Sequence, residues 1–240
     1  MKFAFISFLT LISLVITSCG QPHTDRTIEK VKSASKDNAT SIRSYTGYHT
    51  MYEYTDSSGN SLVIKNSFPK GELYTGPNGE KYVKAIFWTQ VTNNADVPLE
   101  LSINFSGNTY DFLDSTGSSV VRSYKLLVPP DTMTLGKESL LNFGLTNIDD
   151  FVRKSIDKPT SLRRTINPKE SSGVYLIRLA IMQKADSLQV KTKARGGGVT
   201  RAGFSLKGQN LIYTLNGKEF PGGNINLKYL TLKDHRKVGI

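Results

Sequence analysis

The sequence predicts a mainly β protein, an antiparallel β-sandwich of about nine strands with one or two short inserted helices. Three observations lead to this prediction. Apolar residues recur with a period of two after Tyr45, the composition includes 20 Gly, 11 Tyr and 11 Phe, and turn motifs such as Asn-Gly separate the apolar runs. The 240 residues are 38% hydrophobic, which is enough for a sizeable core and excludes a fully disordered chain.

The first 18 residues have the layout of a secretory signal. Lys2 precedes an apolar run over residues 3–16, and two small polar residues and then Cys19 follow. A helix of about 14 residues spans only ~21 Å, less than the ~30 Å hydrocarbon core of a membrane, so a permanent transmembrane helix is not expected. The ending resembles a bacterial lipobox, which implies that Cys19 becomes a lipid-modified N-terminus once residues 1–18 are removed.

The mature chain divides into a tether, residues 19–44, and a sandwich domain, residues 45–240. The tether is rich in Ser, Thr, Lys and Asp and carries only scattered apolar residues, which is typical of a flexible spacer. Lipid attachment at Cys19 uses the only thiol, so the domain has to be stable without disulfides.

Strands are expected wherever apolar and polar residues alternate. In residues 99–105 every second residue is apolar, as in a strand with one dry and one wet face. In residues 83–91, Ala85 and Phe87 mark one side, and Ile86 and Trp88 mark the other. The expected strands are residues 52–55, 62–66, 83–91, 99–105, 120–128, 175–181, 204–206, 211–215 and 225–232.

Two connections have their own signatures. Asn216-Gly217 predicts a type I′ turn that pairs residues 211–215 with residues 218–220, and Pro221 is expected to end this ladder. Apolar residues with helical spacing over residues 146–157, behind Thr146 as the N-cap, predict one helix, or two short ones starting near Lys137. We expect this helical segment to plug one end of the sandwich.

Established catalytic signatures are missing from the sequence. It contains no Gly-x-Ser-x-Gly elbow, His-Glu-x-x-His motif, phosphate-binding loop or dinucleotide fingerprint. With one Cys and three His, neither a cysteine-rich zinc site nor a histidine cluster is expected, so we predict no catalytic residue, metal or cofactor. A glycan hydrolase remains the alternative, because it needs only two facing carboxylates. The candidates are Asp111, Asp114, Asp131, Asp149 and Asp150.

Two groups of residues are candidates for a binding surface. Four tyrosines fall within ten residues, and exposed rings can stack on sugars or on a partner; they are Tyr45, Tyr48, Tyr52 and Tyr54. Net charge is +11, and +8 of it lies between Lys184 and the C-terminus. The basic residues that flank a triple glycine there are Lys191, Lys193, Arg195 and Arg201. The expected partners are the membrane through the lipid, and an envelope protein, an anionic glycan or lipid headgroups; nucleic acid is not expected.

Residues 84–105, with their Asn-rich turn before Pro98, resemble the strand-loop-strand of Ig-like envelope domains. Together with the motifs at residues 130–134, 167–170 and 207–211, the chain resembles Bacteroidetes-type lipoproteins that combine a lipobox signal with an Ig-like β-sandwich. The resemblance implies location and fold and brings no activity with it. Gly20 stands where an inner-membrane retention signal has Asp, and no acidic cluster follows Cys19. We therefore expect a non-catalytic binding or assembly module at the outer membrane, on its periplasmic rather than its outer face.

Overall fold

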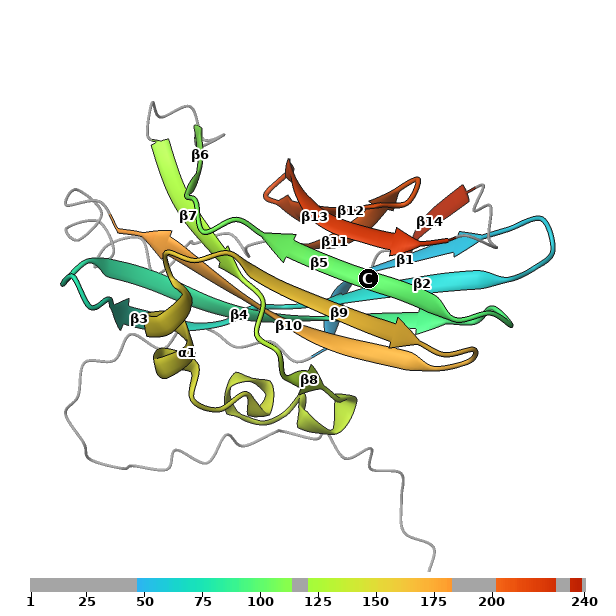
Figure 1. The fold of residues 1–240 in the computed structure, drawn as a ribbon, viewed down its shortest axis with the longest axis horizontal. Coiled ribbons are helices and arrows are strands. Elements are labelled where there is room, and N and C mark those ends of the chain that lie inside the picture. The colour runs from blue at the N-terminus through green and yellow to red at the C-terminus, as the bar shows by residue number, and fades with distance from the viewer. Residues whose placement is uncertain (1–46, 114–120, 183–201, 228–233, 239–240) are drawn as a thin grey trace, which may run out of the picture. The chain divides into compact units, whose positions relative to one another are not determined.

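The computed structural model describes residues 47–113, 121–182, 202–227 and 234–238, and these residues form two antiparallel sheets (Figure 1). The antiparallel β-sandwich is thereby confirmed, with fourteen strands in the described residues where about nine were expected. The predictions for residues 1–44 lie outside the described residues.

The larger sheet has the strand order β14-β1-β2-β4-β10-β7-β6, with β3 also paired to β4 and β8 to β10. Its strands are β1 (Tyr48–Thr55), β2 (Ser61–Ser67), β3 (Lys70–Thr75), β4 (Lys81–Asn93), β6 (Tyr110–Leu113), β7 (Val121–Leu127), β8 (Thr132–Met133), β10 (Ser171–Ile181) and β14 (Asp234–Val238). The smaller sheet has the order β11-β12-β13-β5-β9. Its strands are β5 (Leu99–Phe105), β9 (Thr160–Ile166), β11 (Ala202–Lys207), β12 (Asn210–Leu215) and β13 (Lys218–Asn226).

The main core lies between the two sheets. The inner face of β4 contributes Ala85 and Phe87, which belong to the same buried cluster as Leu101 and Ile103 of β5. The period-two alternation of β5 puts its apolar residues on this face and its polar residues toward solvent, as the sequence predicts.

A second core lies on the outer face of the larger sheet. Ile86 and Trp88 of β4 and Tyr175 and Ile177 of β10 point away from the sandwich interior, because neighbouring residues of a strand face opposite sides. A segment of three short helices covers them (Figure 1). These are η1 (Leu135–Lys137), η2 (Leu141–Gly144) and α1 (Ile148–Ser155).

The position and the start of the helical segment differ from expectation. It covers the outer face of β4 and β10 instead of plugging one end, because the apolar outer residues of these two central strands need a cover. The N-cap of α1 is Asn147, in a left-handed conformation, and Thr146 does not cap it. Val152 of α1 is completely buried, so the predicted apolar face of the helix is the face that packs on the sheet.

The predicted β12–β13 hairpin is confirmed. Asn216 has φ 47° and Gly217 has φ 83°, the two positive angles that a type I′ turn requires. The ladder does not end at Pro221, which lies opposite Ile212, and β13 continues to Asn226. A register shift between Leu211 and Ile212 accommodates this irregular part of the ladder.

Candidate functional site

The described tyrosines of β1 do not share one exposed face. Tyr54 is buried, and its hydroxyl accepts a 2.7 Å hydrogen bond from the backbone N–H of Leu206. Tyr52 also packs against the inner core, whereas Tyr48 packs against the outer one. A register shift between Tyr48 and Thr50 interrupts the alternation and explains this division.

The remaining residues of the predicted binding surface lie outside the described residues. These are Tyr45, Lys191, Lys193, Arg195 and Arg201, together with the lipidation site Cys19. The basic patch therefore stays a prediction.

Two of the candidate carboxylates bind cations of the same domain. Asp149 contacts the ammonium of Lys84, and Asp150 pairs with Arg153 and, at 2.6 Å, with Lys154. The bonds to Lys154 and Arg153 lower the pKa of Asp150, as expected of a carboxylate in the first turn of α1.

No ion pair within the described residues holds Asp111 or Asp131, two further candidate carboxylates. Asp111 of β6 and Asp131 are exposed, and Asp114 lies outside the described residues. The two aspartates of α1 therefore neutralise neighbouring cations of the same domain, and these ion pairs give no reason to assign either aspartate an acid–base role.

Lys84 is a buried cation that joins the helical segment to the sheet. Its side chain is 2% exposed and lies 2.8 Å from Glu72 as well as against Asp149. Burial by itself lowers the pKa of Lys84, but hydrogen bonds to Asp149 and Glu72 outweigh it, and the net shift is upward. Lys84 is therefore charged at neutral pH and links β3, β4 and α1.

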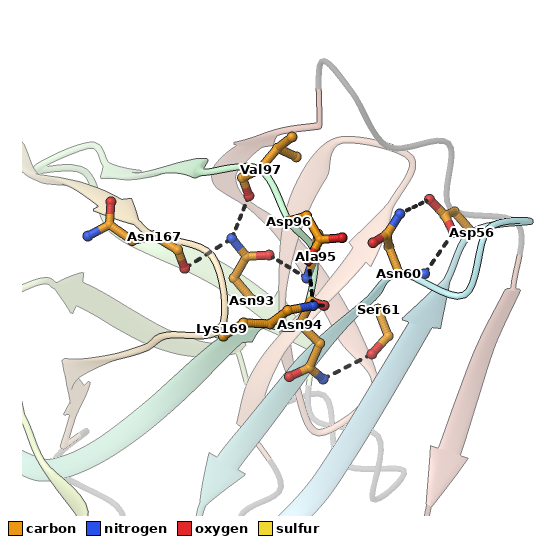
Figure 2. Close-up of polar contacts among 10 residues, drawn as sticks. All are labelled: Asp56, Asn60, Ser61, Asn93, Asn94, Ala95, Asp96, Val97, Asn167 and Lys169. Carbon is orange, nitrogen blue, oxygen red and sulfur yellow. Dashed lines mark hydrogen bonds and ion pairs between the residues drawn. The ribbon is translucent and has the colours of Figure 1, made fainter.

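Three loops meet at the end of the sandwich where β4 passes into β5 (Figure 2). Asn93 is fully buried, and its amide nitrogen lies 2.8 to 3.2 Å from the carbonyl oxygens of Val97, Ile166 and Asn167. Its amide oxygen accepts the backbone N–H of Ala95 at 3.0 Å. These bonds saturate the side chain, so Asn93 organises the loops instead of presenting a group to a ligand.

The loops on either side of Asn93 are also tied together. Asn94 donates to the hydroxyl of Ser61 at 2.9 Å, and the ammonium of Lys169 lies 2.8 Å from Asp96 and 2.6 Å from the carbonyl oxygen of Asn94 (Figure 2). The polar groups of this end are thus engaged with one another.

The surface with the most exposed large apolar side chains is the segment of residues 134–145, which contains η1 and η2 and which we call the leucine loop. Leu141 is 84% exposed, and Leu135 and Leu140 are each 51% exposed. Large apolar side chains exposed next to each other mark contact surfaces more often than isolated ones do. The leucine loop is therefore the candidate functional site.

Buried groups hold the leucine loop in this shape. The ammonium of Lys70 donates to the carbonyl oxygens of Glu138 at 2.7 Å and Leu140 at 2.6 Å, and lies 4.2 Å from the centre of the Phe143 ring. Burial lowers the pKa of Lys70. Phe143 is fully buried, and its carbonyl oxygen accepts a 2.8 Å hydrogen bond from the hydroxyl of Tyr175.

The backbone of the loop adopts an uncommon conformation to combine a buried Phe143 with an exposed Leu141. Asn142 has φ 50° and Phe143 has φ 56°, a left-handed conformation that is costly for a bulky residue. The contacts made by Phe143 and Lys70 offset this cost.

The periodicity of the sequence does not predict the leucine loop. The adjacent pair Leu140-Leu141 is nevertheless a signal that could have found it, because neither a strand nor a helix buries two neighbouring residues on one face.

Within the described part of the chain, no helix is long and apolar enough to cross a bilayer, and no three His, Cys, Asp or Glu side chains gather as a metal would require. Comparison with models of known protein families, with curated proteins and with solved structures finds no match for this chain.

Proposed function

We propose that this protein is a lipid-anchored envelope protein whose β-sandwich acts as a non-catalytic binding or assembly module. The observation that carries the proposal is the position of the only cysteine, Cys19, directly after an apolar leader of signal-peptide length. One acyl chain binds a membrane only marginally, but two or three hold a protein almost permanently, at ~0.8 kcal/mol for each buried CH₂.

The domain supports a non-catalytic role. The carboxylates of α1 are engaged with Lys84, Arg153 and Lys154, and the polar groups around Asn93 are occupied by one another. A glycosidase needs two carboxyl groups aimed at one glycosidic bond, and neither arrangement leaves its groups free for a substrate. Gly20 after the cysteine favours the outer membrane, and the absence of an acidic cluster there favours its periplasmic face.

The anchor is tested by replacing Cys19 with alanine in the full chain. We expect Cys19→Ala to move the protein from the membrane to the soluble fraction, and intact-mass analysis of the native protein to show a chain that starts at Cys19 and carries added acyl mass. Ser18→Ala is the matched control, because alanine is also small, and it should stay on the membrane. A Cys19→Ala protein that still sediments with membranes contradicts the proposal.

The module is tested by gentle detergent extraction of the native protein. A partner that co-purifies in fixed proportion, or an anionic glycan that is retained, supports the binding role. Turnover of a glycan by the purified protein, in the absence of any such partner, would favour the hydrolase instead.

A further inference from the structure

We propose that the leucine loop, residues 134–145, rests in the headgroup region of the membrane to which Cys19 is anchored, and so sets the orientation of the domain. This inference rests on the proposed lipid anchor and goes beyond it. It identifies the surface of the domain that meets the bilayer and a ligand of stated chemistry, the phospholipid layer itself.

The first argument is the apolar surface. Leu135, Leu140 and Leu141 of the leucine loop are all exposed, whereas Leu73, 59% exposed, alternates along β3 with Lys70, Glu72 and Tyr74 and so faces the other side of the sheet. Three of the four large apolar side chains that are exposed in the described residues therefore belong to the leucine loop. Transfer of such side chains from water into the acyl boundary is favourable, roughly in proportion to the apolar area removed from water.

The second argument is charge. The leucine loop contains two charged residues, and both are bonded within the domain. The carboxylate of Glu138 accepts the backbone N–H of Gly47 at 2.7 Å, and the ammonium of Lys137 lies 3.3 Å from the carbonyl oxygen of Thr132. Leu140 and Leu141 therefore enter the bilayer without carrying a free carboxylate toward its negative surface.

The third argument is that the loop is already in shape. Lys70 holds the carbonyl oxygens of Glu138 and Leu140, and Phe143 is locked in the outer core. The leucines cannot rotate inward without breaking these contacts. A preorganised loop loses little conformational entropy on binding.

The fourth argument is the place where the tether enters the domain. Gly47, the first described residue, is bonded to Glu138 inside the leucine loop. Cys19 lies 28 residues earlier (47 minus 19), and a chain of this length reaches at most about 100 Å when fully extended. The chain therefore enters the domain beside the leucine loop, and a membrane within reach of this tether presents itself to the loop at a high effective concentration, so a weak surface suffices.

The chemistry of the loop favours lipid over a protein partner. Hot spots of protein interfaces are enriched in Trp, Tyr and Arg, whereas Leu is under-represented in them. The large exposed side chains of the loop are aliphatic, and its other exposed residues, Thr134, Gly136 and Ser139, are uncharged. Such a surface can pack against acyl chains, which offer neither hydrogen bonds nor charges in return.

The test uses the lipidated full chain in vesicles of phosphatidylethanolamine and phosphatidylglycerol. Because the lipid occupies Cys19, the variant Leu141→Cys has one free thiol for a nitroxide label, and the exposure of Leu141 means that the change leaves the core intact. The matched control is Lys218→Cys, at an exposed position at the start of β13, a strand of the smaller sheet, which Figure 1 shows on the side of the larger sheet away from the helical segment.

We expect the label at position 141 to lose collisions with an aqueous nickel complex and to gain collisions with oxygen, while the label at position 218 stays accessible to nickel. Adding Leu140→Ser should lower the ratio of docked to free loop about five- to tenfold and restore nickel collisions at position 141. Equal nickel accessibility at the two positions overturns the inference, as does a protein, instead of lipid, cross-linking to position 141 in cells.

The same preparation separates failure of the inference from failure of the anchor. Native protein without an added cysteine should take up no label. If it is labelled, Cys19 is a free thiol, the proposed lipid anchor is refuted, and the inference that rests on it falls too. If it is not labelled but position 141 stays in water, the anchor stands and only the inference is overturned.

Discussion

Replacing Asn93 with alanine is expected to lower the free energy of unfolding by about 3 kcal/mol. The amide nitrogen has two hydrogens, so it makes two full hydrogen bonds among the carbonyl oxygens of Val97, Ile166 and Asn167, and the amide oxygen adds one with Ala95. Three hydrogen bonds at about 1 kcal/mol each give this magnitude. Buried carbonyls left without a donor add to it.

Urea denaturation measures the effect. With a slope of roughly 2 kcal/mol per molar urea, a loss of about 3 kcal/mol lowers the midpoint by about 1.5 M and leaves the slope unchanged. Asn94→Ala is the matched control, because the side chain of the neighbouring Asn94 donates a single hydrogen bond, to Ser61, and a loss of about 1 kcal/mol or less is expected.

A second variant separates hydrogen bonding from packing. Asn93→Asp keeps the volume and the acceptor for Ala95 but points a carboxylate at carbonyl oxygens, so at neutral pH it should destabilise at least as much as Asn93→Ala. Burial without a cation raises the pKa of the new carboxyl group, so its penalty is present at neutral pH and shrinks as the pH falls and the group gains a proton. An Asn93→Ala protein within about 0.5 kcal/mol of the native protein would refute the claim that Asn93 holds the three loops together.

Two further predictions concern buried tyrosines. The hydroxyl of Tyr213 is buried without a hydrogen-bond partner in the described residues, so Tyr213→Phe should leave stability unchanged or raise it by about 1 kcal/mol in urea denaturation, and a clear loss would contradict this. Burial raises the pKa of Tyr54 to about 12, against the opposing effect of the N–H of Leu206. The stability that this shift contributes is fully present below pH ~10, the value of an unfolded tyrosine, and is lost as the pH rises toward 12. Tyr54→Phe should therefore lose less stability than the native protein between pH 10 and 12; equal losses would show that folding does not raise the pKa of Tyr54.

The strands that the sequence predicts best are those whose patterns are local. Residues 99–105 alternate without interruption and coincide with β5. Asn216 and Gly217 supply the positive φ angles of the hairpin by their own chemistry. Strands β3 and β9 were not predicted, because the alternation of apolar and polar residues is weak in both. Strand β3 pairs with the first half of β4, and β9 lies at the edge of the smaller sheet.

The candidate site was harder to predict, for a physical reason. The exposure of Leu141 depends on Lys70, 71 positions earlier in the chain, and on Phe143 reaching a core made by β4 and β10. Likewise, one register shift beside Tyr48 places its ring on the opposite side of β1 from Tyr54. No spacing along the chain encodes either event.

The sequence by itself determined the alternation that makes the chain a sandwich and the turn that closes the β12–β13 hairpin, and it predicts a leader before Cys19. Each of these depends on neighbouring residues, whose geometry is set by the period of a strand or the φ angles of a turn. Only the tertiary structure decided that the helical segment covers the outer face of the larger sheet and leaves a leucine loop exposed beside Gly47. Both outcomes depend on the apolar outer face of β4 and β10, strands that are distant from the helical segment in the sequence and meet it only when the chain packs.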